Sequence, residues 1–199
     1  MSLPEEKLLA RAKKVKAVVL DVDGVLTDAG LVYGPRGEAL KVFSARDGFA
    51  VKLAQSEGIR VAILSGRLAA PVKARLADLG IPSGLVIQGS RDKGADIGKI
   101  AGRLGISLDE IAYMGDDTPD LPALARVGLP ACPADASEEA RERAAFVASS
   151  PGGRGAVREL VRLLLRARGT WEQIMEAWAQ GTAAGEFFKG SGKGAHDGK

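Results

Sequence analysis

The stretch AVVLDVDG, residues 17–24, determines the fold class, because an unbroken apolar run ends in it at two closely spaced carboxylates. Four consecutive apolar residues predict a strand buried on both faces, as the strands of a parallel sheet are. Ligands of open α/β sheets bind beyond the carboxyl ends of the strands. We therefore expect Asp21 and Asp23 at the carboxyl end of a buried strand, where a polar site can form.

Outward from this stretch, short apolar runs alternate with segments of helical period. The runs are Arg60–Leu64, Gly84–Ile87 and Ile111–Met114, followed by two shorter ones at Val127–Leu129 and Phe146–Val147. Between them, apolar residues recur at helical spacing. This alternation is typical of a doubly wound parallel α/β sheet with helices on both faces. We predict such a sheet, of the Rossmann-like kind.

One segment interrupts the alternation directly after the first strand. Leu31–Tyr33 and Ala39–Phe43 flank the turn sequence GPRG, residues 34–37, which predicts a β-hairpin. Because it follows the first strand, the hairpin should project near the carboxyl end of that strand. We expect residues 31–43 to form a small flap there, and no separate cap domain.

The domain limits follow from the same patterns. Residues 1–168 predict one α/β domain, residues 169–180 a C-terminal amphipathic helix, and residues 181–199 a Gly/Lys-rich tail without fixed structure. No stretch is long and apolar enough to span a membrane, and the charged residues 1–16 do not resemble a signal peptide. We therefore expect a cytoplasmic protein without a membrane partner.

The composition excludes several classes of chemistry. The chain of 199 residues has one cysteine, Cys132, and one histidine, His196, which lies in the tail. A hydrolase built on a histidine couple and a zinc site of His and Cys are therefore both disfavoured. The net charge of +3 is small and dispersed, which argues against a nucleic-acid partner. Carboxylates remain, and they favour a hard cation such as Mg²⁺.

The remaining polar residues follow successive strands of the predicted sheet. Ser65 follows the second strand, Lys93 opens the helix after the third, and the acids of GDDTPD, residues 115–120, follow the fourth. Carboxylates that converge at one edge repel one another unless a cation neutralises them. Mg²⁺ fits such a site, since it binds a few carboxylates together with phosphate oxygens. The alternative for residues 115–120 is a solvated, capped turn.

This constellation predicts a magnesium-dependent phosphomonoesterase. Asp21 can attack phosphorus to give an aspartyl-phosphate, and Asp23 can protonate the leaving group and then deprotonate water. Ser65 and the amides after it would hold phosphate oxygens at a helix N-terminus. Lys93 would supply positive charge to the phosphoryl group. A surface position is the alternative for Lys93.

Four motifs together resemble those of the haloacid dehalogenase superfamily. They are DVDGVLT at residues 21–27, SGR at 65–67, Lys93, and GDDTPD at 115–120. The resemblance implies that magnesium is bound by Asp21, Asp116 and the backbone carbonyl of Asp23, with Asp117 and Asp120 supporting. The short spacing from Asp21 to Ser65 and from Ser65 to Lys93 is similar to that of the capless members of the superfamily.

Two further segments point to one family within this superfamily: FSARDG at residues 43–48 and GGRGAVRE at 152–159. Over residues 15–168 the chain resembles the 3-deoxy-D-manno-octulosonate 8-phosphate phosphatase family. That family implies a homotetramer in which the hairpin and C-terminal segment of one subunit cover a neighbour's site. It also implies these substrate contacts: Asp23, Ser44, Ala45, Arg46, Asp47, Gly48, Lys52, Gly66, Arg67, Arg75 and Lys93.

Lys52 departs from the family, which usually has an arginine there, so a bidentate clamp on a carboxylate is lost. For Arg75, a solvated helix face is an equal alternative. The resemblance implies hydrolysis of 3-deoxy-D-manno-octulosonate 8-phosphate, a step of lipopolysaccharide precursor synthesis. The alternatives are a phosphatase for a related nine-carbon sugar acid phosphate, and a non-catalytic metal-binding oligomerisation domain. The intact pair of Asp21 and Asp23 argues against the last.

Overall fold

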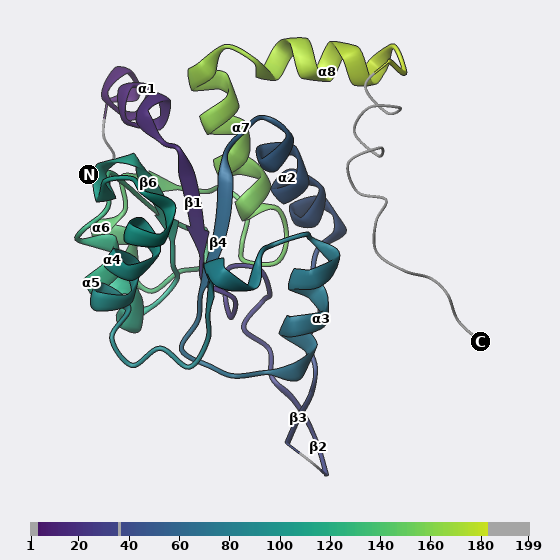
Figure 1. Cartoon of the computed structure of the whole chain (residues 1–199), viewed down its shortest axis with the longest axis vertical. Coiled ribbons are helices and arrows are strands. Elements are labelled where there is room, and N and C mark those ends of the chain that lie inside the picture. The colour runs from purple at the N-terminus through teal and green to yellow at the C-terminus, as the bar shows by residue number, and fades with distance from the viewer. Residues whose placement is uncertain (1–3, 36, 183–199) are drawn as a thin grey trace.

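A parallel sheet forms the centre of the molecule in the computed structural model, which describes residues 4–35 and 37–182 (Figure 1). Its six strands lie in the order β5-β4-β1-β6-β7-β8, and every adjacent pair is parallel. The strands are β1 (Ala17–Leu20), β4 (Arg60–Leu64), β5 (Val86–Ile87), β6 (Ile111–Met114), β7 (Leu129–Cys132) and β8 (Phe146–Val147). The predicted doubly wound α/β fold is confirmed.

The order of the strands reverses at β1, which lies between β4 and β6. Leu20, the last residue of β1, pairs with Ile63 on one side and Met114 on the other. The N–H of Asp21 still donates to the carbonyl of Met114 at 3.0 Å. Asp21 and the segment after β6 therefore leave the sheet at the same level, at the switch point where open α/β sheets bind ligands.

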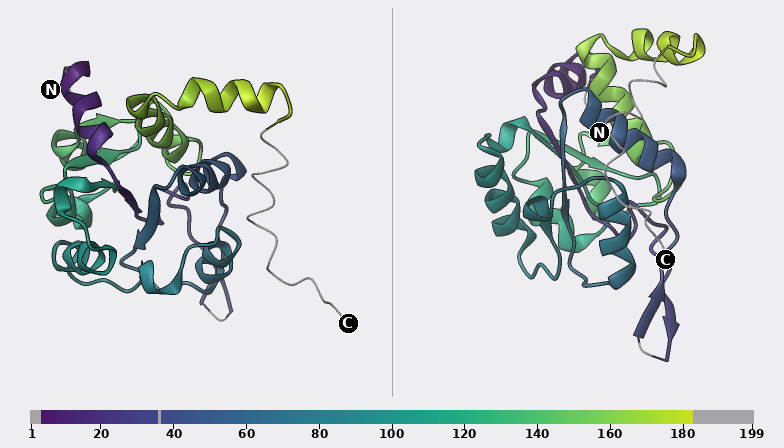
Figure 2. Two further views of the ribbon diagram at one scale, coloured as in Figure 1. Left: turned by 45° about the horizontal axis from the view of Figure 1, so that its top comes forward. Right: turned by 45° about the vertical axis from the view of Figure 1, so that its right-hand side comes forward.

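Helices cover both faces of the sheet, and each face has its own core (Figure 2). Side chains alternate along β1, so that Val18 and Leu20 join one core while Ala17 and Val19 join the other. One face carries α4 (Lys93–Leu104), α5 (Leu121–Leu124) and α6 (Glu138–Arg143). The other carries α1 (Glu5–Lys14), α2 (Ala45–Ser56), α3 (Ala70–Asp78) and α7 (Ala156–Arg168). Short 3₁₀ turns occupy Ser83–Leu85, Leu108–Glu110 and Thr118–Asp120.

The predicted hairpin is present but shorter than expected. β2 (Val32–Gly34) and β3 (Gly37–Leu40) pair as an antiparallel ribbon that projects from the carboxyl edge of the sheet (Figure 1). Gly37 has a φ of 101°, a conformation that favours glycine in the tight turn. Apolar side chains on the ribbon are exposed. The chain after Leu40 is no longer strand, so it descends from the ribbon toward the sheet.

Two strand boundaries differ from the sequence prediction. Gly84 and Leu85 belong to a 3₁₀ turn, so β5 begins only at Val86. The strand expected at Val127–Leu129 instead starts at Leu129 and runs to Cys132. Pro130 does not break it, because β8 pairs only with Ala131 and Cys132, beyond the proline.

The chain after α7 forms α8 (Trp171–Ala179), which lies at the opposite end of the molecule from the hairpin (Figure 1). Trp178 of α8 meets Phe49 of α2 edge to face, with ring centroids 5.2 Å apart. None of the helices within residues 4–35 and 37–182 could cross a membrane by length and apolarity. Of the expected unstructured tail, residues 181–199, the part from residue 183 on, which includes His196, lies outside the described residues.

Candidate active site

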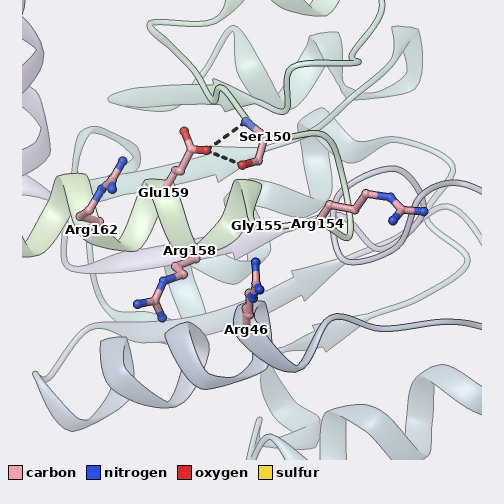
Figure 3. Close-up of a pocket in the computed structure, with 7 residues that line it drawn as sticks. All are labelled: Arg46, Ser150, Arg154, Gly155, Arg158, Glu159 and Arg162. Carbon is pink, nitrogen blue, oxygen red and sulfur yellow. Dashed lines mark hydrogen bonds between the residues drawn. The ribbon is translucent and has the colours of Figure 1, made fainter. Parts of the chain in front are cut away.

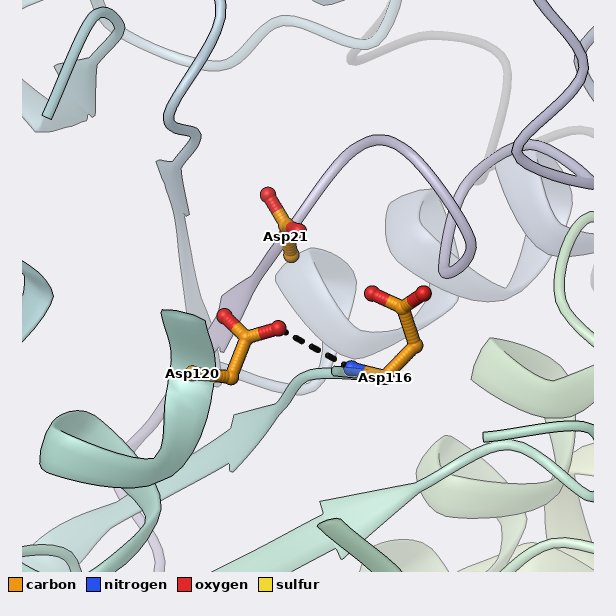
Figure 4. Close-up of side chains that lie close together, drawn as sticks. All are labelled: Asp21, Asp116 and Asp120. Atoms are coloured by element: carbon orange, nitrogen blue, oxygen red, sulfur yellow. Dashed lines mark hydrogen bonds between the residues drawn. The ribbon is translucent and has the colours of Figure 1, made fainter. Parts of the chain in front are cut away.

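Three carboxylates from two strand ends and a 3₁₀ turn meet at the carboxyl edge of the sheet (Figure 4). Asp21 directly follows β1, Asp116 comes two residues after β6, and Asp120 ends the turn Thr118–Asp120. One oxygen from each lies within 4.8 Å of the others. We call these three residues the acidic cluster. The predicted convergence of these segments is therefore present in the structure.

Asp120 is the most fully bonded member of the acidic cluster. Its Oδ2 accepts the N–H groups of Asp116 at 3.1 Å and Asp117 at 3.3 Å. Its Oδ1 accepts from Lys93 Nζ at 2.5 Å and from the hydroxyl of Tyr113. Asp120 therefore fixes the loop that carries Asp116, and it has little freedom left to bind another group.

Lys93 enters the acidic cluster from the first position of α4. Asp92 caps this helix, accepting the N–H of Ala95 at 2.9 Å. The Nζ of Lys93 lies 3.0 Å from Asp21 Oδ2, in addition to its bond with Asp120. Burial opposes the ammonium charge, but the two carboxylates outweigh it and raise the pKa of Lys93. The surface alternative for Lys93 is wrong, because the side chain is buried.

One lysine does not balance three carboxylates. Burial, followed by the negative charge of Asp120, raises the pKa of Asp21 to about 7 despite the opposing effect of Lys93. Burial raises the pKa of Asp116 to about 7 as well, with Asp120 and Asp21 adding to it. The Oδ1 atom of Asp21 is buried and accepts no hydrogen bond from any described residue.

Gly24 leaves room for the carboxylate of Asp116. It has a φ of 80°, and a Cβ at this position would collide with Asp116 Oδ2. The backbone after Asp23 therefore approaches the acidic cluster as closely as a glycine allows. Excess negative charge, an unpaired buried oxygen and donors that are all oxygens fit a hard divalent cation such as Mg²⁺.

The carboxylate of Asp23 lies apart from the acidic cluster. Its Oδ1 accepts a hydrogen bond from Lys41, at the base of the hairpin. Its Oδ2 lies 3.7 Å from Arg67 Nε. Asp21 and Asp23, two residues apart, therefore face different partners: buried acids for the first, and for the second the buried Lys41 and the half-exposed Arg67.

Ser65 directly follows β4, as predicted. Its backbone is held by β5 and the loop after it: its N–H donates to Ile87 O at 2.9 Å, and its carbonyl accepts from Ser90 N at 3.0 Å. The Oγ accepts the N–H of Arg67 at 3.3 Å. The expected helix N-terminus is wrong, because α3 begins only at Ala70 and a loop, including Gly66, follows Ser65.

The segment Ser44–Gly48 forms the start of α2, and Asp47 ties it to α7. Ser44 Oγ accepts the N–H of Asp47 at 3.2 Å and caps α2. The buried carboxylate of Asp47 accepts the N–H groups of Gly155 at 3.0 Å and Arg158 at 2.9 Å. The side chain predicted to contact substrate therefore caps a second helix in this structure.

Arg75 of α3 lies against the start of α2. Its guanidinium donates to the carbonyl of Ser44 at 3.2 Å and pairs with Asp78 at 2.6 Å. It also lies 5.9 Å from the ring centroid of Phe43. Gly48 makes this approach possible, since a Cβ there would collide with the guanidinium. Arg75 therefore packs between α2 and α3, and the alternative of a solvated helix face is wrong.

Arg46 points into a separate hollow between α2 and α7, with a volume of about 490 Å³ (Figure 3). Four arginines surround it, and its one carboxylate, Glu159, accepts instead from the backbone and hydroxyl of Ser150. We call this hollow the arginine pocket; its lining residues are Arg46, Ser150, Arg154, Gly155, Arg158, Glu159 and Arg162. Lys52 lies further along α2 and Ala45 begins it. Neither belongs to the acidic cluster.

Sequence reasoning missed three residues that contact the predicted site. Tyr113 is fully buried in β6 and reaches Asp120, and the only signal for it is one hydroxyl in an aliphatic strand. Glu38 and Lys41 join Asp23 and Arg67 from the hairpin. The sequence gives little sign of their role, because charged residues are expected in a segment predicted to be an exposed flap.

Comparison with known proteins defines the class. A family model described as haloacid dehalogenase-like hydrolase matches residues 85–160. The chain is 42% identical over 167 residues to 3-deoxy-D-manno-octulosonate 8-phosphate phosphatase KdsC of Escherichia coli (strain K12), covering 83% of this chain and 87% of that one. Against the protein of the same name from Haemophilus influenzae, the identity is 40% over 159 residues, or 80% and 87% of the two chains.

Solved structures agree with this result. A Moraxella catarrhalis 3-deoxy-D-manno-octulosonate 8-phosphate phosphatase, in complex with magnesium, phosphate and KDO, superposes with a TM-score of 0.83 and 34% identity, covering 87% of this chain and 98% of that one. The cobalt-bound Haemophilus influenzae phosphatase gives 0.79 and 39%, with coverage of 81% and 93%. The fold and its acidic edge thus define a haloacid dehalogenase-like hydrolase. Within that class, the chain belongs to the 3-deoxy-D-manno-octulosonate 8-phosphate phosphatase family.

Proposed function

We propose that this chain is a magnesium-dependent phosphatase that hydrolyses 3-deoxy-D-manno-octulosonate 8-phosphate to the free sugar acid and phosphate. The observation that carries the proposal is the buried, unpaired Oδ1 of Asp21, held beside Lys93 in the acidic cluster. Such an oxygen is costly unless a ligand completes it. A metal-bound phosphoryl group would do so. The product would feed lipopolysaccharide precursor synthesis.

The residues proposed to hold Mg²⁺ are Asp21, Asp116 and the backbone carbonyl of Asp23. Asp117 supports them from the same loop, where its side chain accepts the N–H of Thr118 at 2.7 Å. Asp120 supports them differently, because four donors already occupy its oxygens and it orients Asp116 and Lys93. When bound, the cation neutralises the clustered carboxylates and draws charge from the phosphoryl oxygens.

Asp21 attacks phosphorus in the first step, and the bond from phosphorus to the sugar oxygen breaks. Asp23 gives its proton to that departing oxygen, and an aspartyl-phosphate forms on Asp21. In the second step Asp23 takes a proton from water, which attacks phosphorus and releases phosphate and Asp21. Lys93 and Ser65 stabilise the phosphoryl oxygens throughout.

Sugar-acid recognition is assigned to residues of five segments: the loop after β1, α2 with its N-cap, the loop after Ser65, α3, and the start of α4. These are Asp23, Ser44, Ala45, Arg46, Asp47, Gly48, Lys52, Gly66, Arg67, Arg75 and Lys93. None of them is a member of the acidic cluster, which supports a site completed by a neighbouring subunit. Exposed apolar residues of the hairpin support the same idea: Leu31, Val32, Tyr33, Leu40 and Val42. We therefore propose a cytoplasmic homotetramer, to be checked by light scattering.

The test is phosphate release from a panel of sugar-acid phosphates, compared by kcat/KM with magnesium and after its removal by chelation. The expected result is a preference for the eight-carbon substrate by ~10-fold or more over the nine-carbon analogue, and loss of activity without metal. A preference for the nine-carbon compound would overturn the substrate while leaving the phosphatase class intact. Undiminished activity without magnesium would overturn the metal assignment.

A further inference from the structure

Lys41 has a fully buried ammonium group although it stands at the foot of an exposed hairpin. The exposed fraction of its side chain is 0%, and its Nζ contacts two carboxylates: Asp23, and Glu38 at 2.5 Å. Burial alone would lower the pKa of Lys41, but its hydrogen bonds to Asp23 and Glu38 outweigh that effect and raise it. The lysine is therefore held as a cation between two acids.

The contacts close into a ring of alternating charges. Glu38, with 8% of its side chain exposed, also accepts from Arg67 Nη2 at 2.9 Å. Arg67 in turn lies 3.7 Å from Asp23 through its Nε, and it donates to the hydroxyl of Tyr33 at 3.1 Å. Asp23, Lys41, Glu38 and Arg67 thus connect the loop after β1, the second strand of the hairpin with the residue that follows it, and the loop after β4.

The ring holds the two oxygens of Asp23 unequally. Lys41 hydrogen-bonds Oδ1, whereas Oδ2 lies 3.7 Å from Arg67 Nε, a distance beyond a hydrogen bond. A carboxylate clamped at one oxygen keeps its orientation and leaves the other oxygen to exchange a proton. Lys41 also cannot leave Asp23 without a cost, because its buried charge would lose a partner.

We propose that Lys41 and Glu38 are positioning residues for proton transfer by Asp23. Lys41 fixes Oδ1 of Asp23 so that Oδ2 faces the leaving group, and Glu38 holds Lys41 in place. The inference rests on the proposed role of Asp23 as acid and base. It makes the hairpin part of the chain's own site, in addition to any cover that it provides for a neighbouring subunit.

Leaving-group dependence separates this role from a merely structural one. A sugar or other alkyl oxygen needs a proton to depart, whereas 4-nitrophenolate departs without one. In full-length protein with magnesium, Lys41→Met should lower kcat/KM for the alkyl phosphate by ~100-fold, within the range of general acid catalysis. For 4-nitrophenyl phosphate the loss should stay below ~5-fold. Glu38→Gln should show the same pattern with a smaller loss.

Two further variants complete the comparison. Lys41→Arg keeps the charge and should recover at least ~10-fold of the alkyl phosphate activity over Lys41→Met. Lys16→Met is the matched control, since Lys16 forms an exposed pair with Glu110 at 2.6 Å and should change neither substrate. Equal losses on both substrates in Lys41→Met, without recovery in Lys41→Arg, would show a purely structural role and overturn the inference.

Asp23→Asn distinguishes failure of this inference from failure of the mechanism. If Asp23→Asn shows the leaving-group dependence and Lys41→Met does not, the inference fails and the proposed mechanism stands. If Asp23→Asn lowers kcat/KM equally for both substrates, the proton-transfer role of Asp23 itself is wrong, and the role of Lys41 falls with it. If both variants lose more activity on the alkyl phosphate than on 4-nitrophenyl phosphate, the inference is supported.

Discussion

The acidic cluster and the arginine pocket both gather charges of one sign, yet they differ in how the protein supports them. The acids come from two strand ends and a 3₁₀ turn, are largely buried, and have oxygens within 4.8 Å of one another. Three of the arginines stand on helices and Arg154 lies in the turn before α7, where 68% of its side chain is exposed. Arg158 is steadied by the rings of Phe49 and Trp171, at 5.9 and 5.8 Å.

Burial, and not the number of like charges, therefore creates the demand for a counterion. Water screens the arginines and makes their proximity inexpensive. Asp21 and Asp116 instead have raised pKa values, which means that their charged forms are unfavourable without a cation. This contrast between the two regions can be tested by substitution, by metal removal and by a change of pH.

The largest effect is expected at Asp21. Asp21→Asn removes the proposed nucleophile and should lower kcat by ~10⁴-fold or more, because no other group replaces it. The same change removes one repelling charge, so the metal-free variant should melt at a higher temperature than the metal-free parent. Steady-state kinetics and thermal denaturation measure the two effects. Asp109→Asn, at an exposed acid, is the control; comparable activity in Asp21→Asn would refute covalent catalysis.

The next effect is expected at Gly24. Gly24→Ala places a methyl group against Oδ2 of Asp116 and should weaken magnesium binding and lower activity by ~100-fold. Gly58→Ala is a matched control, because Gly58 has a similar φ of 74° but no atom within 4 Å of the place that a Cβ would take. Both variants bear the backbone strain of about 1 kcal/mol, so only Gly24→Ala should alter the magnesium dependence of activity. Equal behaviour of the two would contradict the steric account.

A smaller effect concerns pH. In the metal-free chain, Asp21 and Asp116 have pKa values raised from 3.8 to about 7. Between those values the folded state binds more protons than the unfolded state, so these groups make the free energy of unfolding fall as pH rises. The melting temperature should therefore be lower at pH 8 than at pH 6, by ~2–4 °C. Saturating magnesium should remove this difference in melting temperature. If the metal-free protein shows no such difference, the electrostatic account is wrong.

The smallest effect is expected in the arginine pocket. Arg162→Gln removes one exposed guanidinium and should change the free energy of unfolding by less than about 0.5 kcal/mol, as surface substitutions do. Urea denaturation measures it, and kcat/KM should remain within ~2-fold of the parent. A large gain in stability would show that the arginines repel one another strongly, and the contrast between the two regions would then fail.

The sequence predicts the centre of the molecule well for a physical reason. Strands such as Ala17–Leu20 are continuous apolar runs, and topology alone brings the residues after them to one edge. Asp21, Lys93 and Asp116 are therefore predictable as neighbours. The loop after Ser65 and the strand through Pro130 could not be predicted, because pairing with distant segments overrides the preferences of their local sequence.

Contacts between side chains of segments far apart in the chain are the other feature that the sequence does not predict. Tyr113 and Asp120 meet because a 3₁₀ turn folds back over β6, and Lys41 reaches Asp23 because the hairpin leans toward the sheet. Arg46 turns away to the arginine pocket, because Asp47 next to it is committed to the start of α7. These choices depend on three-dimensional packing, and no spacing of residues encodes them.

The turn before α7 also constrains how the protein is made. Gly153 donates its N–H to Val25 O at 2.9 Å, and a Cβ on Gly152 would collide with the carbonyl of Gly24. The loop that carries Asp23 therefore rests on residues that leave the ribosome well over a hundred positions later. Contacts so distant in sequence form slowly, and no nascent chain shorter than this turn can complete its catalytic loop. Activity should appear late in synthesis, only after α7 has docked.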